Sequence, residues 1–183
     1  VWRAPTDNDR HIKNEWGLLD NDNWCGENMN RLFSKVYSCE LNDSTITVTG
    51  SLAGVSRMPF IRHTVIYSFF ESGEIKISLQ ATKRNDLQVY LPRIGFELAI
   101  PVENDSFTYY GMGKGECYCD MHYHAKVGLY SSNAGAEYVN YPYPQEHGNH
   151  IRAKLLRMGC GITFATDNEF EFNVSEYTSQ ALT

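Results

Sequence analysis

Regular alternation of apolar and polar residues limits what this chain can fold into. In the run IKISLQAT at 75–82, Ile, Ile, Leu and Ala alternate with Lys, Ser, Gln and Thr. Successive side chains of a strand point to opposite faces of a sheet. The run therefore predicts a strand with one face in water. Similar alternation at 45–52 and 170–174 predicts two further strands of this kind.

Other segments predict more strands and very little helix. VIYSFF at 65–70 is apolar on both faces, and the turn residues ESGE at 71–74 join it to the next strand as a hairpin. Further strands are expected at 36–41, 94–100, 107–110, 127–130, 151–156 and 160–165. One helix is expected after the N-cap residue Asn23, because Met29, Leu32, Phe33 and Val36 follow at helical spacing.

Pattern alone thus predicts an all-β fold, an antiparallel β-sandwich with long loops at 1–25, 111–125 and 131–150. Residues 1–183 are expected to form a single domain, because no shift in composition marks a boundary. The net charge of −6, with no basic run, argues against a nucleic-acid partner. No apolar stretch approaches the length of a membrane span, so no membrane partner is expected.

The segment YYGMGKGECYCD at 109–120, followed by MHYH, raises the possibility of a metal site. Cys117, Cys119, His122 and His124 are residue types that bind zinc. Their spacing differs from that of zinc knuckles, where two residues separate each pair of ligands, and this argues against zinc. The glycines at 111, 113 and 115 lack the spacing of a phosphate-binding loop, and a tight loop leaving a strand explains them better.

Carboxylates provide a second kind of candidate site. Glu116 with Asp120, Asp7 with Asp9, and Glu146 are each able to supply acid and base groups for glycoside hydrolysis, which needs two carboxyls flanking one bond. No pair stands out by sequence, because such a role depends on geometry.

Four segments, in order, resemble conserved runs of the β-galactosidases of glycoside hydrolase family 2. VWRAPTDND at 1–9 resembles the run WRAPTDND, and LPRIG at 91–95 matches its LPRIG strand. The segment at 109–120 resembles W-Y-G-R-G-P-x-E-N-Y-x-D, and YPYPQEHGNH at 141–150 resembles Y-x-x-P-Q-E-x-G-N-R. Together they cover the chain nearly from end to end.

The resemblance is to the C-terminal, or small-chain, domain of those enzymes. It implies a large β-sandwich of the supersandwich type, similar to galactose mutarotase and cut at both ends. The two catalytic glutamates of the family lie on a barrel domain, so no catalytic residue is expected here. The resemblance also implies no metal or cofactor in this chain, any magnesium and sodium sites of the parent lying outside it. The parent is expected to be a bacterial homo-oligomer, and its compartment, cytoplasm or periplasm, is left open.

Specific residues carry the expected roles of this domain. By the resemblance, Asp7, Asn8, Asp9 and Arg10 belong to a loop at the rim of the active site. Four retained residues are expected to be structural polar anchors: Glu116, Tyr118, Asp120 and Glu146. Family residues are replaced at Met112 (Arg), Lys114 (Pro), Cys117 (Asn), Cys119 (Pro), Met121 (Arg) and His150 (Arg). Because buried carboxylates need partners, Lys114 or a histidine is expected to pair with Glu116 and Asp120.

The expected function is that of a domain in an enzyme that hydrolyses terminal β-D-galactosides. The chain would support the active-site rim and form interfaces with the rest of the enzyme or a large-chain partner. One alternative is a stand-alone carbohydrate-binding module, favoured by the 13% aromatic content. Another is an aldose epimerase, with Glu97, Glu116 or Glu146 facing a histidine across the sugar. The last alternative is a zinc-binding protein.

Overall fold

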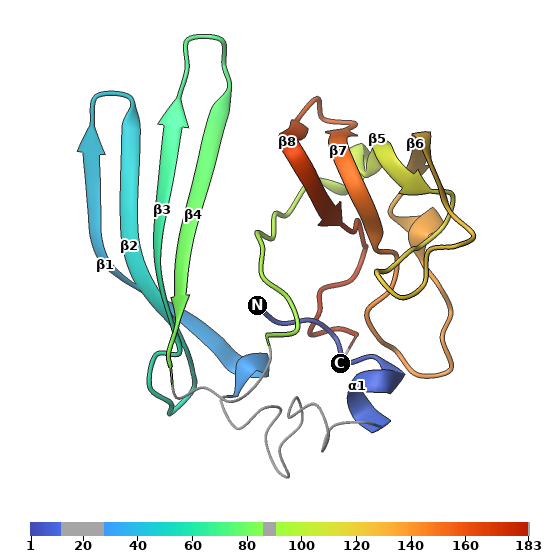
Figure 1. Cartoon of the computed structure of the whole chain (residues 1–183), viewed down its shortest axis with the longest axis horizontal. Coiled ribbons are helices and arrows are strands. Elements are labelled where there is room, and N and C mark those ends of the chain that lie inside the picture. Colours follow the sequence, from blue (N-terminus) through green and yellow to red (C-terminus); the bar gives the residue numbers. More distant parts are fainter. Residues whose placement is uncertain (12–27, 86–90, 183) are drawn as a thin grey trace. The chain divides into compact units, whose positions relative to one another are not determined.

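The computed structural model describes residues 1–11, 28–85 and 91–182. By its internal contacts the chain forms two compact units. Unit 1 is Val1–Arg3 with Asn8–Ile94, and unit 2 is Ala4–Asp7 with Gly95–Thr183. Each unit holds one antiparallel four-stranded sheet (Figure 1). The predicted all-β class is therefore confirmed, and the strand content is that of a β-sandwich. The single domain stays a prediction.

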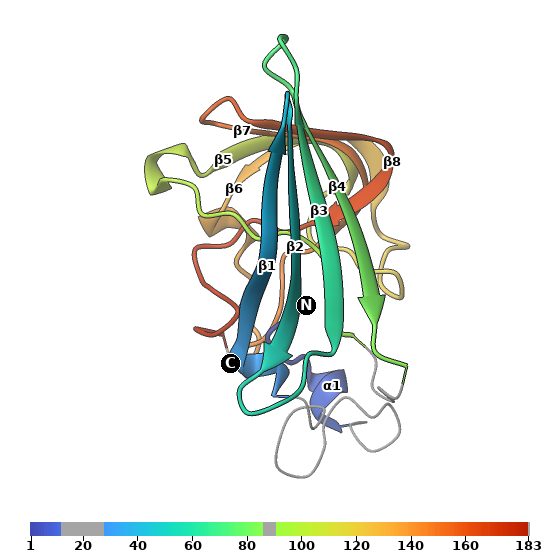
Figure 2. The same cartoon turned by 90° about the vertical axis from the view of Figure 1, so that its left-hand side faces the viewer.

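The sheet of unit 1 is a meander in chain order. Its strands are β1 (Leu32–Asn42), β2 (Thr45–Gly54), β3 (Ile61–Phe69) and β4 (Ile75–Lys83). Figure 2 shows the four strands side by side in that order. The hairpin between β3 and β4 turns at Gly73, whose φ of 87° suits glycine. This hairpin and the strands expected at 45–52, 65–70 and 75–82 are confirmed.

The helix expected after Asn23 is wrong where the structure describes it. Met29–Arg31 form only a short 3₁₀ turn, η2, and β1 begins at Leu32. Met29 instead joins the buried Trp2, Phe60 and Ile61 in a small core. Partly buried apolar residues pack against this core, namely Val1, Leu32, Leu52 and Leu91. Asn23 itself lies outside the described residues.

The sheet of unit 2 has the order β6-β5-β7-β8. Its strands are β5 (Ser106–Gly113), β6 (Lys126–Asn133), β7 (His150–Met158) and β8 (Thr163–Phe172). The segments expected at 160–165 and 170–174 therefore belong largely to one strand, β8. The strand expected at 94–100 is wrong, because those residues are irregular and lead into the 3₁₀ turn η3 (Val102–Asn104).

Aromatic residues build the core of unit 2. Phe107, Tyr109, Leu156 and Met158 are buried between the strands. Phe172 of β8 meets Phe107 and Tyr109 edge to face, with ring centroids 5.8 and 5.1 Å apart. This packing fixes the first half of β5 against β7 and β8.

The remaining helical elements are short. They are α1 (Asp7–His11) and the 3₁₀ turn η4 (Gly135–Glu137). Among the residues described, no helix has both the length and the apolar character needed to cross a membrane.

Candidate functional site

Three segments that are distant in sequence meet in unit 2. The backbone N–H of Glu146 donates to the carbonyl of Ala4 at 3.2 Å, and that of Asp7 donates to Gln145 Oε1 at 3.0 Å. The N–H of Gly148 donates to Glu116 Oε2 at 2.9 Å. These hydrogen bonds join three of the runs that resemble the galactosidases, those at 1–9, 109–120 and 141–150.

The Glu116 cluster, which comprises Glu116, Tyr118, Tyr141 and Gly148, lies at the centre of this meeting point. Besides the Gly148 N–H, the Glu116 carboxylate accepts a short hydrogen bond from the Tyr141 hydroxyl and one of 3.3 Å from Tyr118. Its partners in the described residues are therefore uncharged donors. The expectation that Lys114 or a histidine would pair with this carboxylate is wrong: Lys114 is exposed.

The histidines of this loop bind backbone atoms instead. His124 Nε2 lies 3.0 Å from the carbonyl oxygen of Glu116, and His122 Nδ1 lies 3.1 Å from that of Tyr118. Both rings therefore stabilise the loop conformation that presents the Glu116 side chain.

The two tyrosines of the cluster stay protonated at neutral pH and act as hydrogen-bond donors. Burial raises the pKa of Tyr141 to about 12, and its hydrogen bond to Glu116 adds to the rise. Burial, followed by the negative charges of Glu116 and Glu146, raises the pKa of Tyr118 well above its usual range. A hydroxyl that stays protonated can donate to a carboxylate but cannot serve as a general base near pH 7.

The other two expected anchors differ in their surroundings. Glu146 is 2% exposed, and its Oε1 accepts a hydrogen bond of 3.0 Å from Asn173 Nδ2, just after β8. Asp120 is exposed in the turn closed by Tyr118 and Met121, so water can solvate its charge. The geometry suits an anchoring role for Glu146, and it gives Asp120 none.

The expected rim residues begin α1. Asp7 belongs to unit 2 through its bond to Gln145, whereas Asn8 and Asp9 belong to unit 1. Asp9 is 2% exposed and makes a two-pronged ion pair with Arg3, with N–O distances of 3.1 and 2.8 Å. Asn8 is exposed. The side chain of Arg10 lies outside the described residues.

Sequence reasoning missed a buried network beside the cluster. His150 Nδ1 lies 3.0 Å from the Tyr109 hydroxyl, and its Nε2 lies 2.9 Å from Glu137 Oε2. His150 and Tyr109 are 0% and 1% exposed. The order hydroxyl, imidazole, carboxylate is that of a nucleophile system, but a tyrosine so deeply buried cannot reach a substrate. The one feature of the sequence that could have indicated this network is His150, which stands where the family has Arg.

Charge is stabilised on the carboxylate of this network. Burial by itself would raise the pKa of Glu137. The hydrogen bonds from His150 and Ser132, with the charge of His150, outweigh burial and bring the pKa below its ordinary value. Burial, and then the charge of Glu137, raises the pKa of Tyr109. The network therefore holds an ionised glutamate against a neutral tyrosine.

The two cysteines considered as zinc ligands, Cys117 and Cys119, do not form a ligand pair in the described structure. Cys117 is buried and its thiol lies 3.6 Å from the carbonyl oxygen of Met112, whereas Cys119 is exposed. In the part of the chain that the structure describes, no group of three or more His, Cys, Asp or Glu residues could hold a metal ion. The zinc alternative therefore has no ligand set there.

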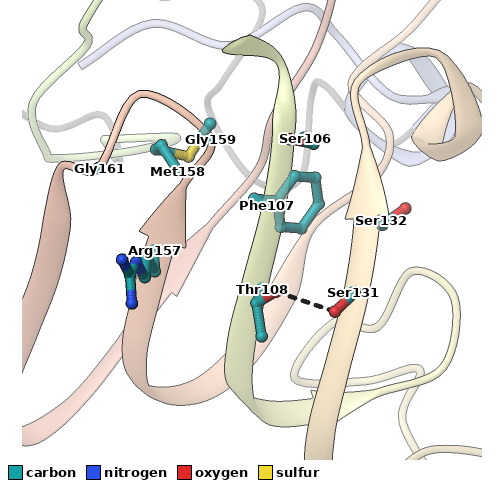
Figure 3. A pocket seen from close by; sticks show the side chains of 9 residues that line it. All are labelled: Ser106, Phe107, Thr108, Ser131, Ser132, Arg157, Met158, Gly159 and Gly161. Atoms are coloured by element: carbon teal, nitrogen blue, oxygen red, sulfur yellow. Dashed lines mark hydrogen bonds between the residues drawn. The ribbon is translucent and has the colours of Figure 1, made fainter.

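A hollow of about 270 Å³ lies at the other end of β5 (Figure 3). Its lining includes Arg157 and the hydroxyl-bearing Ser106, Thr108, Ser131 and Ser132. Thr108 and Ser131 hydrogen-bond to each other at 2.9 Å, as the dashed line shows. Phe107 and Met158 also line the hollow, so its wall is mixed in character. Ser106 and the Glu116 loop adjoin opposite ends of β5.

Comparisons with known proteins agree on one family. The family model described as the beta galactosidase small chain matches residues 1–183. A beta-galactosidase of Actinobacillus pleuropneumoniae is 29% identical over 187 residues, which cover 100% of this chain and 18% of that protein. Beta-galactosidases of Staphylococcus xylosus and Kluyveromyces lactis are 26% and 30% identical, covering 100% and 96% of this chain and 18% and 17% of those proteins. The chain thus spans less than a fifth of these relatives.

Proposed function

The chain belongs to the β-galactosidase small-chain family, and we propose that it works as a domain of a longer enzyme that hydrolyses terminal β-D-galactosides. The observation that carries this proposal is the match of the small-chain family model to all of residues 1–183. Relatives named beta-galactosidases support the same reaction for the parent.

The chain's own role in this proposal is support of the active-site rim. Asp7 is tied to Gln145, and Gly148 is tied to Glu116, so one set of contacts holds the start of the expected rim loop. Fixing such a loop matters because small displacements of substrate-positioning groups can lower rates strongly. The rim role of Asn8, Asp9 and Arg10 is part of the proposal.

The chemistry itself is assigned to a part of the parent outside this chain. A retaining glycosidase needs two carboxyl groups about 5 Å apart on either side of the bond to be cleaved. Glu116 is occupied by two tyrosine hydroxyls and a backbone N–H, and Glu146 is almost fully buried. Neither carboxylate has the access to substrate that such a role requires.

Further partners follow from the same proposal. The rest of the parent chain, or a large-chain partner, would supply the catalytic residues and any magnesium and sodium sites. The galactoside would bind across the rim, and the parent would assemble as a homo-oligomer.

Cleavage of a chromogenic β-galactoside tests the proposal. The parent polypeptide is expected to release the chromophore, and the purified chain of residues 1–183 to release none above buffer. Turnover by the purified chain would overturn the assignment of chemistry to another domain. A parent that binds no galactoside and cleaves none would overturn the proposed reaction.

Carbohydrate binding by the chain alone is a second candidate, favoured by the hollow of Figure 3, whose lining combines Arg157 and several hydroxyls with Phe107 and Met158. A guanidinium beside several hydroxyls can bond to sugar hydroxyl groups. Calorimetry with galactose and lactose tests it: millimolar or tighter binding that Arg157→Ala weakens, and that the exposed control Lys154→Ala leaves intact, supports this candidate. The epimerase alternative lacks support, because neither the Glu116 nor the Glu146 carboxylate has a hydrogen bond to a histidine side chain among the described residues.

A further inference from the structure

The sheet of unit 1 brings two positive side chains to one tyrosine ring. Lys35 of β1 and Arg62 of β3 are both paired with Ser51 of β2, so the three residues form one row across neighbouring strands (Figure 2). Residues of such a row share a face of the sheet. Lys35 Nζ lies 5.6 Å and Arg62 Cζ lies 5.9 Å from the centre of the Tyr37 ring. These four residues are called the cationic cluster.

A bulge in β1 explains the position of Tyr37. The pairing with β2 shifts between Val36 and Ser38, so no residue of β2 lies directly opposite Tyr37. The Tyr37 hydroxyl lies 2.8 Å from Ser51 Oγ, within hydrogen-bond distance, and Ser51 is 2% exposed. Tyr37 is therefore anchored at its tip, while 48% of the residue stays exposed between the two cations.

Within the described residues, no carboxylate neutralises the two cations. Lys35 and Arg62 are exposed, and neither makes a salt bridge in residues 1–11, 28–85 and 91–182. Like charges that share a face repel each other, and an exposed aromatic ring attracts a cation only weakly. The cluster therefore favours a bound anion.

The face that carries the cluster is mostly polar. The adjacent row on this face is uncharged and consists of Ser38, Thr49, Thr64 and Gln80. Glu40 lies in the row after that, with Thr47, Ile66 and Ser78. Antiparallel sheets commonly leave their polar face in water, which gives a dissolved ligand access to the cluster.

The charge of the cluster matches that of one phosphate group. At pH 7 a phosphate group carries a charge of about −1.5 to −2, close to the two positive charges of Lys35 and Arg62. A guanidinium can donate two parallel hydrogen bonds to phosphate oxygens, and a lysine ammonium binds them as a point charge. We propose that the cationic cluster binds a phosphate group, free or as the ester of a small sugar, a role beyond the proposed galactosidase function.

Calorimetric titration of the chain of residues 1–183 at pH 7 and low salt tests the site. Inorganic phosphate and galactose 6-phosphate are the two probes. At least one is expected to bind with a millimolar or smaller dissociation constant, although the net charge of −6 repels anions from the chain as a whole. Tighter binding of galactose 6-phosphate identifies the sugar ester as the ligand, and equal or weaker binding identifies the free ion. If neither probe binds, the proposal is wrong.

Four exposed side chains give variants and controls. Lys35→Ala and Arg62→Ala should each weaken binding by about tenfold. Arg62→Lys should weaken it less, because the charge is kept and only the paired donors are lost. Lys76→Ala removes a cation from the far end of the same face, and Arg157→Ala removes one from the hollow of Figure 3. Both controls should bind as the unchanged chain does.

The controls also give the results that would overturn the site. Binding that survives both Lys35→Ala and Arg62→Ala would place the phosphate elsewhere. Equal losses from all four alanine substitutions would show that phosphate responds to overall charge and not to the cationic cluster.

Discussion

A single side chain, Glu137, links the stability of unit 2 to pH. Its folded pKa lies below its ordinary value of 4.5, so the ionised form is favoured by folding. The resulting stabilisation is fully present above that pH and is lost as the pH falls through the folded pKa. Glu137→Gln is expected to lower the free energy of unfolding by about 2 kcal/mol near pH 7 and by much less at an acidic pH below the folded pKa. Urea unfolding at the two pH values measures this difference.

The control for this prediction is Glu169→Gln. Glu169 also faces a basic side chain, Arg152 at 3.5 Å, but both are about half exposed. Exposed pairs contribute roughly 0–1 kcal/mol, so this change should be small at both pH values. An equal loss from both substitutions would show that the buried position of Glu137 adds nothing.

The contacts of Glu116 show what sequence could and could not predict about single residues. The resemblance identified four polar anchor positions, Glu116, Tyr118, Asp120 and Glu146. The structure puts the Gly148 N–H on Glu116, a contact across 32 positions of sequence. No local pattern encodes such a contact, because it depends on how two loops meet. Lys114 was expected as partner only because cations commonly neutralise carboxylates, yet here two uncharged hydroxyls donate hydrogen bonds to the Glu116 carboxylate.

Among the strands, β5 and β7 approach each other unusually closely at Gly111. A Cβ added there would lie 2.9 Å from Ala153 Cα, a backbone atom that cannot move aside. Gly111→Ala is therefore expected to lower the free energy of unfolding by about 2 kcal/mol. Gly95→Ala is the control, because its Cβ would meet nothing within 4 Å, and it should change stability by less than about 1 kcal/mol. Thermal and urea unfolding of both variants check the prediction, and equal stabilities would contradict it.

The strand β1 explains why one sequence prediction failed. Its register shifts between Val36 and Ser38, which leaves Tyr37 as an extra residue opposite β2. The expected helix rested on Met29, Leu32, Phe33 and Val36, all of which precede this bulge. Leu32 and Val36 are four residues apart, a spacing that places two side chains on one face of a strand as well as on one face of a helix. The spacing therefore could not distinguish the two structures. The strand β4 has no bulge, and its simple alternation predicted it correctly.

At the scale of the whole chain, the order in which the strands pair could not be predicted from the sequence. Alternation identified most strands, but both sheets depend on pairings that only the folded chain shows. In unit 2 the order β6-β5-β7-β8 inserts β5 between strands that follow it in sequence. The Tyr109, His150 and Glu137 network arises from that order, since it brings β5 and β7 together beside η4.

The net charge of the chain predicts how it behaves in isolation. At pH 7 the charge of −6 opposes association, and this protection falls toward the isoelectric point of about 5.5. Light scattering by the isolated chain is therefore expected to rise as the pH approaches that value. Lys154→Glu replaces a positive charge with a negative one at an exposed position of β7, so it should lower the pH at which scattering begins. Lys154→Arg keeps the positive charge and is the control, which should leave that pH unchanged. The same onset of scattering for both variants would show that net charge does not control association.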